Sequence, residues 1–272
     1  MTAASTRPTP APRTRPKLLV VGHPRGGTSL LAQYLHSLGL RTVEDGRAHP
    51  DYPSGFMEHL PALLFTKACE RLRGQRDRLT DESLIEEAFL EISCMRAMFH
   101  DAYAVFDRPE VDFLKLPDHA LALDFMRRRF PHVRVLGVWR QPSAAVASYY
   151  RREYGAHPGV RGLFYAIGTW NMYARRLIDF QRHHPEAIDI VSIDELVAGN
   201  GSLSDLLRAR GFPVTGDHGI RDVLRTEWGG SPGWVGRGLP VWEAVFRTRV
   251  ERERKVYFDS STHVRALAAL SR

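Results

Sequence analysis

The chain has 272 residues, of which 43% are hydrophobic and 25% are charged. This balance is typical of a globular protein with a sizeable core, and it excludes a disordered or fibrous polymer. The formal net charge of +7 favours phosphorylated or sulfated ligands without demonstrating nucleic-acid binding. No apolar run approaches the roughly 20 residues that cross a bilayer, so we expect a soluble protein with no membrane span.

Residues 1–16 contain three arginines and four prolines but no apolar stretch, which predicts a disordered basic tail rather than a secretory signal. Residues 17–272 show neither a repeat nor a second composition regime, so we expect one domain there. The only cysteines, Cys69 and Cys94, lack the spacing of a disulfide framework or a thiolate metal site. A cytoplasmic location and no metal requirement are therefore expected.

Short apolar runs alternate with stretches of helical periodicity along the chain. Strands are predicted at residues 17–22, 112–116, 133–139 and 188–193. Helices are predicted after residue 29 and at residues 84–99, 120–130, 142–152, 162–183 and 241–258. In the longest of these helices one stripe contains Phe164, Ile167, Trp170, Tyr173, Leu177 and Phe180. This alternation predicts an α/β fold, with a P-loop-like parallel sheet flanked by helices on both faces.

Residues 22–29, Gly-His-Pro-Arg-Gly-Gly-Thr-Ser, form a glycine-rich turn between the first predicted strand and the first predicted helix. Backbone N–H groups and the positive end of the helix dipole make such a turn an anion site. The P-loop of nucleoside triphosphatases carries a lysine after its second glycine, but Thr28 stands there and the cation is Arg25. The turn is therefore expected to bind phosphate without the usual lysine.

Within this turn, residues 24–29 resemble the loop of the PAPS-dependent sulfotransferases that binds the 5′-phosphosulfate, as in the carbohydrate-type and bacterial branch. The resemblance implies that Arg25 contacts the bridging oxygen of the phosphosulfate, and an arginine fork suits phosphate geometry. It also implies four residues that hold the 5′-phosphate: Gly26, Gly27, Thr28 and Ser29.

A second motif follows the strand predicted at residues 133–139. Arg140, Pro142 and Ser148 match the family's Arg-x-Pro pattern with a later serine, which binds the 3′-phosphate of PAPS. Arg140 stands at the carboxyl end of a parallel strand, where such sheets place ligands. Further on, Arg237 in the loop at residues 229–240 resembles the cation of a late loop that closes on the 3′-phosphate, although its spacing departs from the family pattern.

Sulfuryl transfer to a hydroxyl requires a base to accept its proton. Cytosolic members of the family use a histidine two residues after a strand lysine, but after Lys115 that position holds Pro117, and His119 comes later. Residues 55–58, Gly-Phe-Met-Glu, resemble a Gly-aromatic-x-Glu motif of carbohydrate-type and bacterial members, which implies Glu58 as the base. Whether Glu58, His59 or His119 is the base stays open at this point.

We further expect Arg25 and Lys115 to offset charge on the leaving group, and Phe56 and His59 to contact the acceptor. The expected donor is PAPS, with PAP as product. The expected acceptor is a small-molecule hydroxyl on a sugar, a lipid headgroup or a secondary metabolite of a bacterium. No nucleic-acid partner is expected, and the oligomeric state stays open.

Two other functions compete with this interpretation. In a P-loop kinase, residues 190–194 would be the apolar strand that ends in a Mg²⁺-binding aspartate, but Thr28 would leave the triphosphate charge poorly compensated. A polyanion or nucleic-acid binder would use the net charge and residues 149–152, Tyr-Tyr-Arg-Arg, although a solvated helix face is the commoner meaning of such a run.

Overall fold

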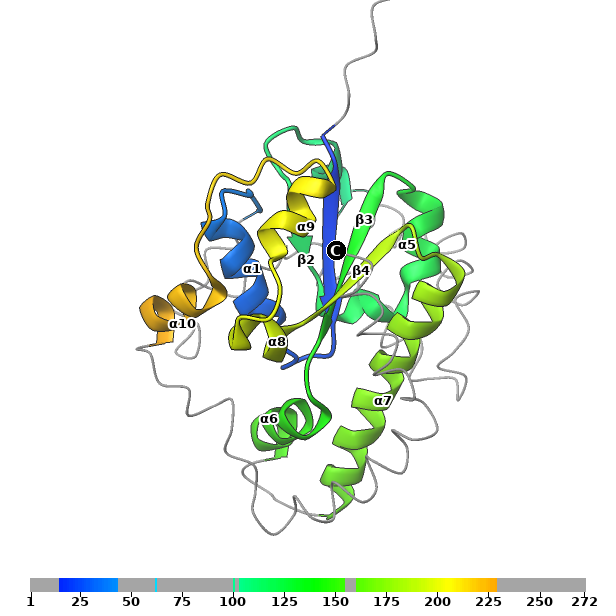
Figure 1. Cartoon of the computed structure of the whole chain (residues 1–272). Coiled ribbons are helices and arrows are strands. Elements are labelled where there is room, and N and C mark those ends of the chain that lie inside the picture. Colours follow the sequence, from blue (N-terminus) through cyan, green and yellow to red (C-terminus); the bar gives the residue numbers. More distant parts are fainter. Residues whose placement is uncertain (1–14, 44–61, 63–99, 101–102, 155–159, 229–272) are drawn as a thin grey trace, which may run out of the picture.

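The computed structural model describes residues 15–43, 62, 100, 103–154 and 160–228. In this part of the chain four parallel strands form one sheet, in the order β2-β1-β3-β4 (Figure 1). The strands are β1 (Lys17–Gly22), β2 (Phe113–Lys115), β3 (Val133–Trp139) and β4 (Ile188–Ser192). The sequence predicted the bounds of β1 and β3 correctly, and it made β2 and β4 slightly too long.

The central strand β1 is buried on both of its faces, as its uninterrupted apolar run predicted. Leu18 and Val20 belong to the hydrophobic core on one face of the sheet. Leu19 and Val21 belong to the core on the other face. The alternation of a strand thus divides one apolar run between two helical layers, which confirms the predicted α/β fold.

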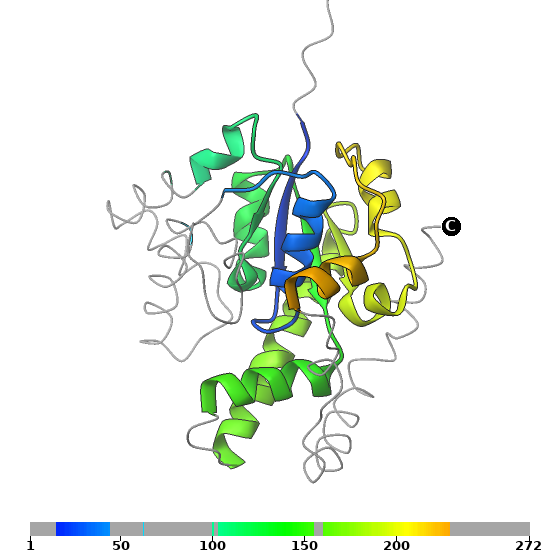
Figure 2. The same cartoon turned by 90° about the vertical axis from the view of Figure 1, so that its left-hand side faces the viewer.

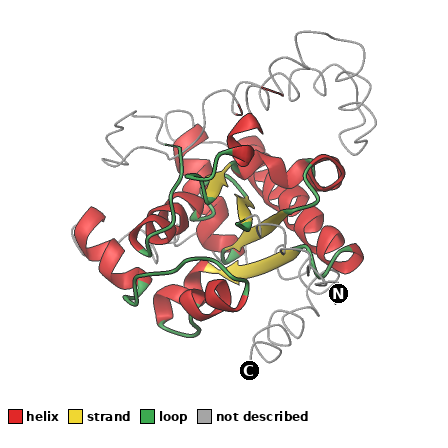
Figure 3. Ribbon diagram, turned by 90° about the horizontal axis from the view of Figure 1, so that it is seen from above, coloured by secondary structure: helices red, strands yellow, loops and turns green. Residues whose placement is uncertain are grey.

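One face of the sheet is covered by α1 (Thr28–Ser37), α8 (Ile193–Ala198), α9 (Leu203–Ala209) and α10 (Ile220–Trp228). Figure 2 shows α1 and α10, blue and orange, in front of the sheet. The opposite face is covered by η1 (Ala104–Asp107), η2 (Pro117–Leu121), α5 (Leu123–Arg129) and α7 (Val160–His183). Seen from above, the strands lie between these two layers (Figure 3).

Beyond the carboxyl ends of the strands, α6 (Pro142–Tyr154) packs against the first half of α7. Its Ala145 and Val146 meet Ala166 and Trp170 of α7 in a third, smaller core. The stripe predicted along α7 is wrong at Phe164, which is 46% exposed. This part of α7 extends beyond the carboxyl ends of the strands, where the sheet no longer lies against it (Figure 1).

Several helices differ from the sequence prediction. The helix predicted at residues 120–130 is a 3₁₀ segment, η2, which is followed by the shorter α5. Helices α8, α9 and α10 were not predicted from the sequence, although Ser192 and Ser202 cap α8 and α9 by accepting hydrogen bonds from backbone N–H groups. The helices predicted at residues 84–99 and 241–258, and most of the tail at residues 1–16, lie outside the described residues. Among the helices that are described, none is both long and apolar enough to cross a bilayer.

The strand order determines where a ligand can bind. The chain leaves β1 toward β2 on one side and later returns to β3 on the other side, so the connections diverge between β1 and β3. Parallel sheets of this kind bind ligands at the carboxyl ends of the strands, at the point of divergence. The glycine-rich turn follows β1 there, and Arg140 follows β3.

Candidate phosphate-binding site

The glycine-rich turn begins with a tight bend over residues 23–26. The backbone N–H of Gly26 donates a hydrogen bond to the carbonyl oxygen of His23 at 2.8 Å. Pro24 occupies the second position of this bend, and Arg25 in the third has a positive φ of 68°. These are the features of a type II turn, whose third position normally holds glycine. Because an arginine there costs about 1–2 kcal/mol, the surrounding contacts have to hold it in place.

Helix α1 starts directly after the bend, and its N-terminus faces the turn. Gly27 precedes the helix with a φ of 96°, and no side chain of the described residues caps this end. The first backbone N–H groups of a helix have no intrahelical partner, so they can donate to an anion held by the turn. Thr28 and Ser29 supply hydroxyl groups at the same helix end, and Thr28 is buried.

Gly27 is required for two separate reasons, its φ and its neighbour. A Cβ at this position would lie 2.8 Å from Cγ1 of Ile193. We expect Gly27→Ala to lower the free energy of unfolding by about 2–4 kcal/mol, from backbone strain together with the overlap. Urea denaturation monitored by circular dichroism measures this change.

Gly201→Ala is the matched control, because Gly201 also has a positive φ of 106° but nothing lies within 4 Å of its Cβ position. In this variant the free energy of unfolding is expected to fall by only about 1–2 kcal/mol, from backbone strain alone. Equal losses in the two variants would show that Ile193 does not restrict the turn.

Three cationic side chains meet at this turn, one from the turn itself and two from neighbouring strand ends. Nε of Arg25 donates to the hydroxyl of Ser148 on α6 at 3.4 Å. Nη1 of Arg140, just after β3, donates to the carbonyl oxygen of Arg25 at 3.2 Å. Nζ of Lys115, the last residue of β2, donates to the hydroxyl of Ser29 at 3.0 Å. The sheet thus brings together Arg25, Ser29, Lys115, Arg140 and Ser148, which are distant in sequence.

Two of these cations are removed from solvent. The side chains of Lys115 and Arg140 are 1% and 2% exposed. A buried cation interacts with a bound anion more strongly than an exposed one, because little water screens the pair. The arrangement is suited to a ligand with several negative charges at the carboxyl ends of β1, β2 and β3.

Residues 193 and 194, at the start of α8, support the turn and the segment after β3. Oδ2 of Asp194 accepts a hydrogen bond from the backbone N–H of Gln141 at 2.6 Å. Ile193 lies against Gly27. Asp194 therefore orders the backbone next to Arg140, a role that was not predicted from the sequence because it depends on a contact between distant segments. Within the described part of the chain, no group of three or more His, Cys, Asp or Glu residues could hold a metal ion.

The segment after Lys115 contains His119, one of the three candidate bases. Nε2 of His119 lies against the hydroxyl of Tyr103, and the histidine is buried. The neighbouring Asp118 accepts a hydrogen bond from the hydroxyl of Tyr173 at 2.5 Å. Both side chains are thus held by tyrosines of the layer that covers the sheet.

Four candidate residues lie outside the described residues: Phe56, Glu58, His59 and Arg237. The predicted loop at residues 229–240 lies outside them too. Their roles stay predictions from the sequence.

Comparison with known proteins finds a matching family model and a similar solved structure. The model of a family described as the sulfotransferase family matches residues 16–214. The solved structure of the sulfotransferase STF9 from Mycobacterium avium is similar at 13% sequence identity, over 89% of this chain and 77% of that chain, with a TM-score of 0.46. No curated protein matches the chain at a significant level.

Proposed function

The chain belongs to the sulfotransferase family, and we propose that it transfers the sulfuryl group of PAPS to a hydroxyl of a small-molecule, sugar or lipid acceptor. The observation that carries the proposal is the meeting of Arg25, Lys115 and Arg140 at one glycine-rich turn. PAPS carries a phosphosulfate and a separate 3′-phosphate, so it needs cations at two places. An enzyme of bacterial secondary metabolism in the cytoplasm fits this proposal.

The residues of the turn fit the 5′-phosphosulfate. Gly26 and Gly27 have no room for side chains, because a Cβ on either would lie within 2.8 Å of a neighbouring atom. Their backbone and the N-terminus of α1 are therefore available to phosphate oxygens. In our proposal Thr28 and Ser29 bind the 5′-phosphate, and Arg25 binds the bridging oxygen.

The 3′-phosphate would be held on the β3 side of the site. Arg140 and Ser148 both contact Arg25, so a ligand held by all three would span the turn and the start of α6. In our proposal Arg237 adds a further cation from the chain after α10. PAPS supplies the activated sulfuryl group, and no metal ion is needed to neutralise it.

The transfer step would be direct and in line. The acceptor oxygen forms a bond to sulfur while the bond between sulfur and the bridging phosphate oxygen breaks, and PAP leaves with the electron pair. In our proposal Glu58 accepts the proton of the acceptor hydroxyl, with Phe56 and His59 beside the acceptor. Arg25 and Lys115 offset the negative charge that develops on the leaving phosphate, which is the kind of contribution that preorganised cations make to catalysis.

A kinase would use the same turn differently, and two observations disfavour it. Thr28 stands where a P-loop kinase places the lysine for the β- and γ-phosphates. Asp194, the candidate Mg²⁺ ligand, accepts the backbone N–H of Gln141. Sulfuryl transfer needs neither a lysine at residue 28 nor a metal at residue 194.

The test compares ligands in thermal unfolding. At a concentration of about 100 times its Kd, PAP without metal is expected to raise the free energy of unfolding by about 2.7 kcal/mol and the Tm by about 5–10 °C. Mg²⁺ with ATP is expected to have little effect. Incubation with ³⁵S-labelled PAPS and a panel of hydroxylated compounds then identifies the acceptor. Stabilisation by Mg²⁺ with ATP but not by PAP would favour the kinase, and salt-sensitive DNA binding without a PAP response would favour the polyanion binder.

A further inference from the structure

His23 begins the tight bend of the glycine-rich turn, and its side chain is buried. It is 4% exposed. Its ring lies against the rings of Tyr149 and Tyr173, with centroid distances of 5.2 and 5.5 Å. Among the residues that the structure describes, neither Nδ1 nor Nε2 of His23 has a hydrogen-bond partner. Buried polar atoms of proteins are nearly always paired, so these two nitrogens require an explanation.

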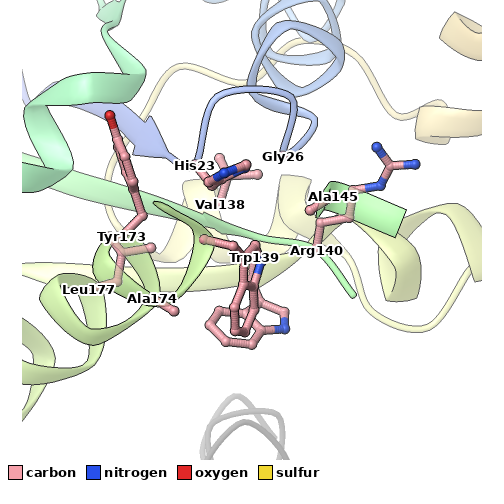
Figure 4. A pocket seen from close by; sticks show the side chains of 10 residues that line it. His23, Gly26, Val138, Trp139, Arg140, Ala145, Tyr173, Ala174 and Leu177 are labelled. Atoms are coloured by element: carbon pink, nitrogen blue, oxygen red, sulfur yellow. The ribbon is translucent and has the colours of Figure 1, made fainter. Parts of the chain in front are cut away.

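A small cavity adjoins His23, and Gly26 and Arg140 also line it (Figure 4). Its volume is about 10 Å³, which is the space that one water molecule needs. The wall has polar groups from His23 and Arg140 and apolar groups from the end of β3 and from α7. The cavity is thus large enough for one water molecule, and a histidine nitrogen is available to bind it.

The charge state of His23 suits this role. Burial, and then the nearby positive charge of Arg140, lower the pKa of His23 to about 3. The imidazole is therefore neutral near pH 7. A neutral imidazole has one nitrogen that donates and one that accepts, so it can bind water in either direction.

We infer that His23 is a positioning residue, whose imidazole binds one water molecule in this cavity and thereby holds the bend that carries Arg25. The carbonyl oxygen of His23 accepts the hydrogen bond that closes the bend, so fixing the side chain fixes the first residue of the turn. Arg25 has a φ of 68°, a conformation that persists only where its surroundings enforce it.

The other neighbours of His23 are themselves held in place. The hydroxyl of Tyr173 donates to Asp118, which fixes the ring that packs on the imidazole. The effect on PAP binding rests on the proposed function, because it assumes that the turn binds the phosphosulfate end of the donor. The cavity water does not rest on it.

The test distinguishes the contribution of the aromatic ring of His23 from that of its two nitrogens. His23→Phe keeps an aromatic ring between the two tyrosines but has no nitrogen, so PAP is expected to bind about 5- to 10-fold more weakly by calorimetry. His23→Asn and His23→Gln keep a polar group near Nδ1 or Nε2, and at least one of them is expected to bind PAP within about 3-fold of the unaltered protein. His132→Phe, an exposed histidine away from the turn, is the matched control and is expected to change nothing.

Two results would overturn the inference. In the first, His23→Phe binds PAP as well as the unaltered protein, or better than both amide variants, so that only packing matters. In the second, a high-resolution crystal structure of the unaltered protein shows the cavity dry, a result that decides the matter even where the variants fail to fold. Failure of the unaltered protein to bind PAP would refute the proposed function, while the crystal structure would still test His23.

Discussion

Replacing Lys115 with methionine is expected to lower kcat for sulfuryl transfer by about 10²- to 10³-fold, the loss typical of removing one preorganised charge-stabilising group. Lys115 is almost fully buried at the carboxyl end of β2, with Nζ 3.0 Å from the hydroxyl of Ser29. Methionine keeps most of the length of the unbranched side chain but removes the charged amino group. Because negative charge on the leaving phosphate grows toward the transition state, the loss should fall on kcat more than on the affinity for PAP.

Lys17→Met is the matched control for this variant. Lys17 is also a buried lysine of the sheet, but it lies at the amino end of β1, far from the turn along the strand. Its Nζ donates to the carbonyl oxygens of Arg108 and Val111, so its removal should reduce stability and leave kcat unchanged. Steady-state kinetics with saturating PAPS, together with urea denaturation, measure both effects. If Lys115→Met kept a kcat within a few-fold of the unaltered enzyme, Lys115 would have no part in charge stabilisation.

The sequence predicted those parts of the fold and site that depend on neighbouring residues. The apolar run of β1 ends at Gly22, and the helical pattern resumes at Thr28, so the strand, turn and helix could be assigned without any distant contact. Arg140 could be placed for the same reason, because it follows the apolar run of β3. Parallel pairing of these two strands then brings the turn and Arg140 to one edge of the sheet.

What the sequence could not predict depends on contacts between distant segments. His23 stands in a turn rich in glycine, and turns of that composition usually lie on the surface. It is buried because Tyr149 and Tyr173, from α6 and α7, fold over it. Phe164 is the opposite case, a residue predicted to be buried that is exposed. It belongs to the apolar stripe of α7 but lies in the part of the helix that extends beyond the sheet.

Lys115 has one property that the sequence predicted and one that it did not. Its place at the end of a strand was visible in the sequence, and the family resemblance suggested its role. Its burial, and its hydrogen bond to Ser29, arise only because β1 pairs with β2 in a register that aligns Val20 with Lys115. The three cations lie at one edge of the sheet because the strand order places β1 between β2 and β3.

The other large effect is expected for the base. We expect Glu58→Gln to lower kcat by about 10²- to 10⁴-fold, the usual contribution of a positioned base, with little change in PAP affinity. Glutamine keeps the shape of the side chain but cannot accept the acceptor's proton. The unaltered enzyme should lose activity at acid pH as the base becomes protonated, which gives an acid limb in the plot of kcat against pH. The residual activity of Glu58→Gln should lack this acid limb.

The described residues that directly follow β2 either lack a titratable group or contact a tyrosine. Pro117 has no titratable group, Asp118 accepts a hydrogen bond from Tyr173, and His119 lies against the hydroxyl of Tyr103. His119→Gln is therefore the matched control: it should reduce the free energy of unfolding, because a buried pair is broken, and preserve both kcat and the acid limb. If His119→Gln abolished this loss of activity at acid pH while Glu58→Gln retained it, the base would be the histidine.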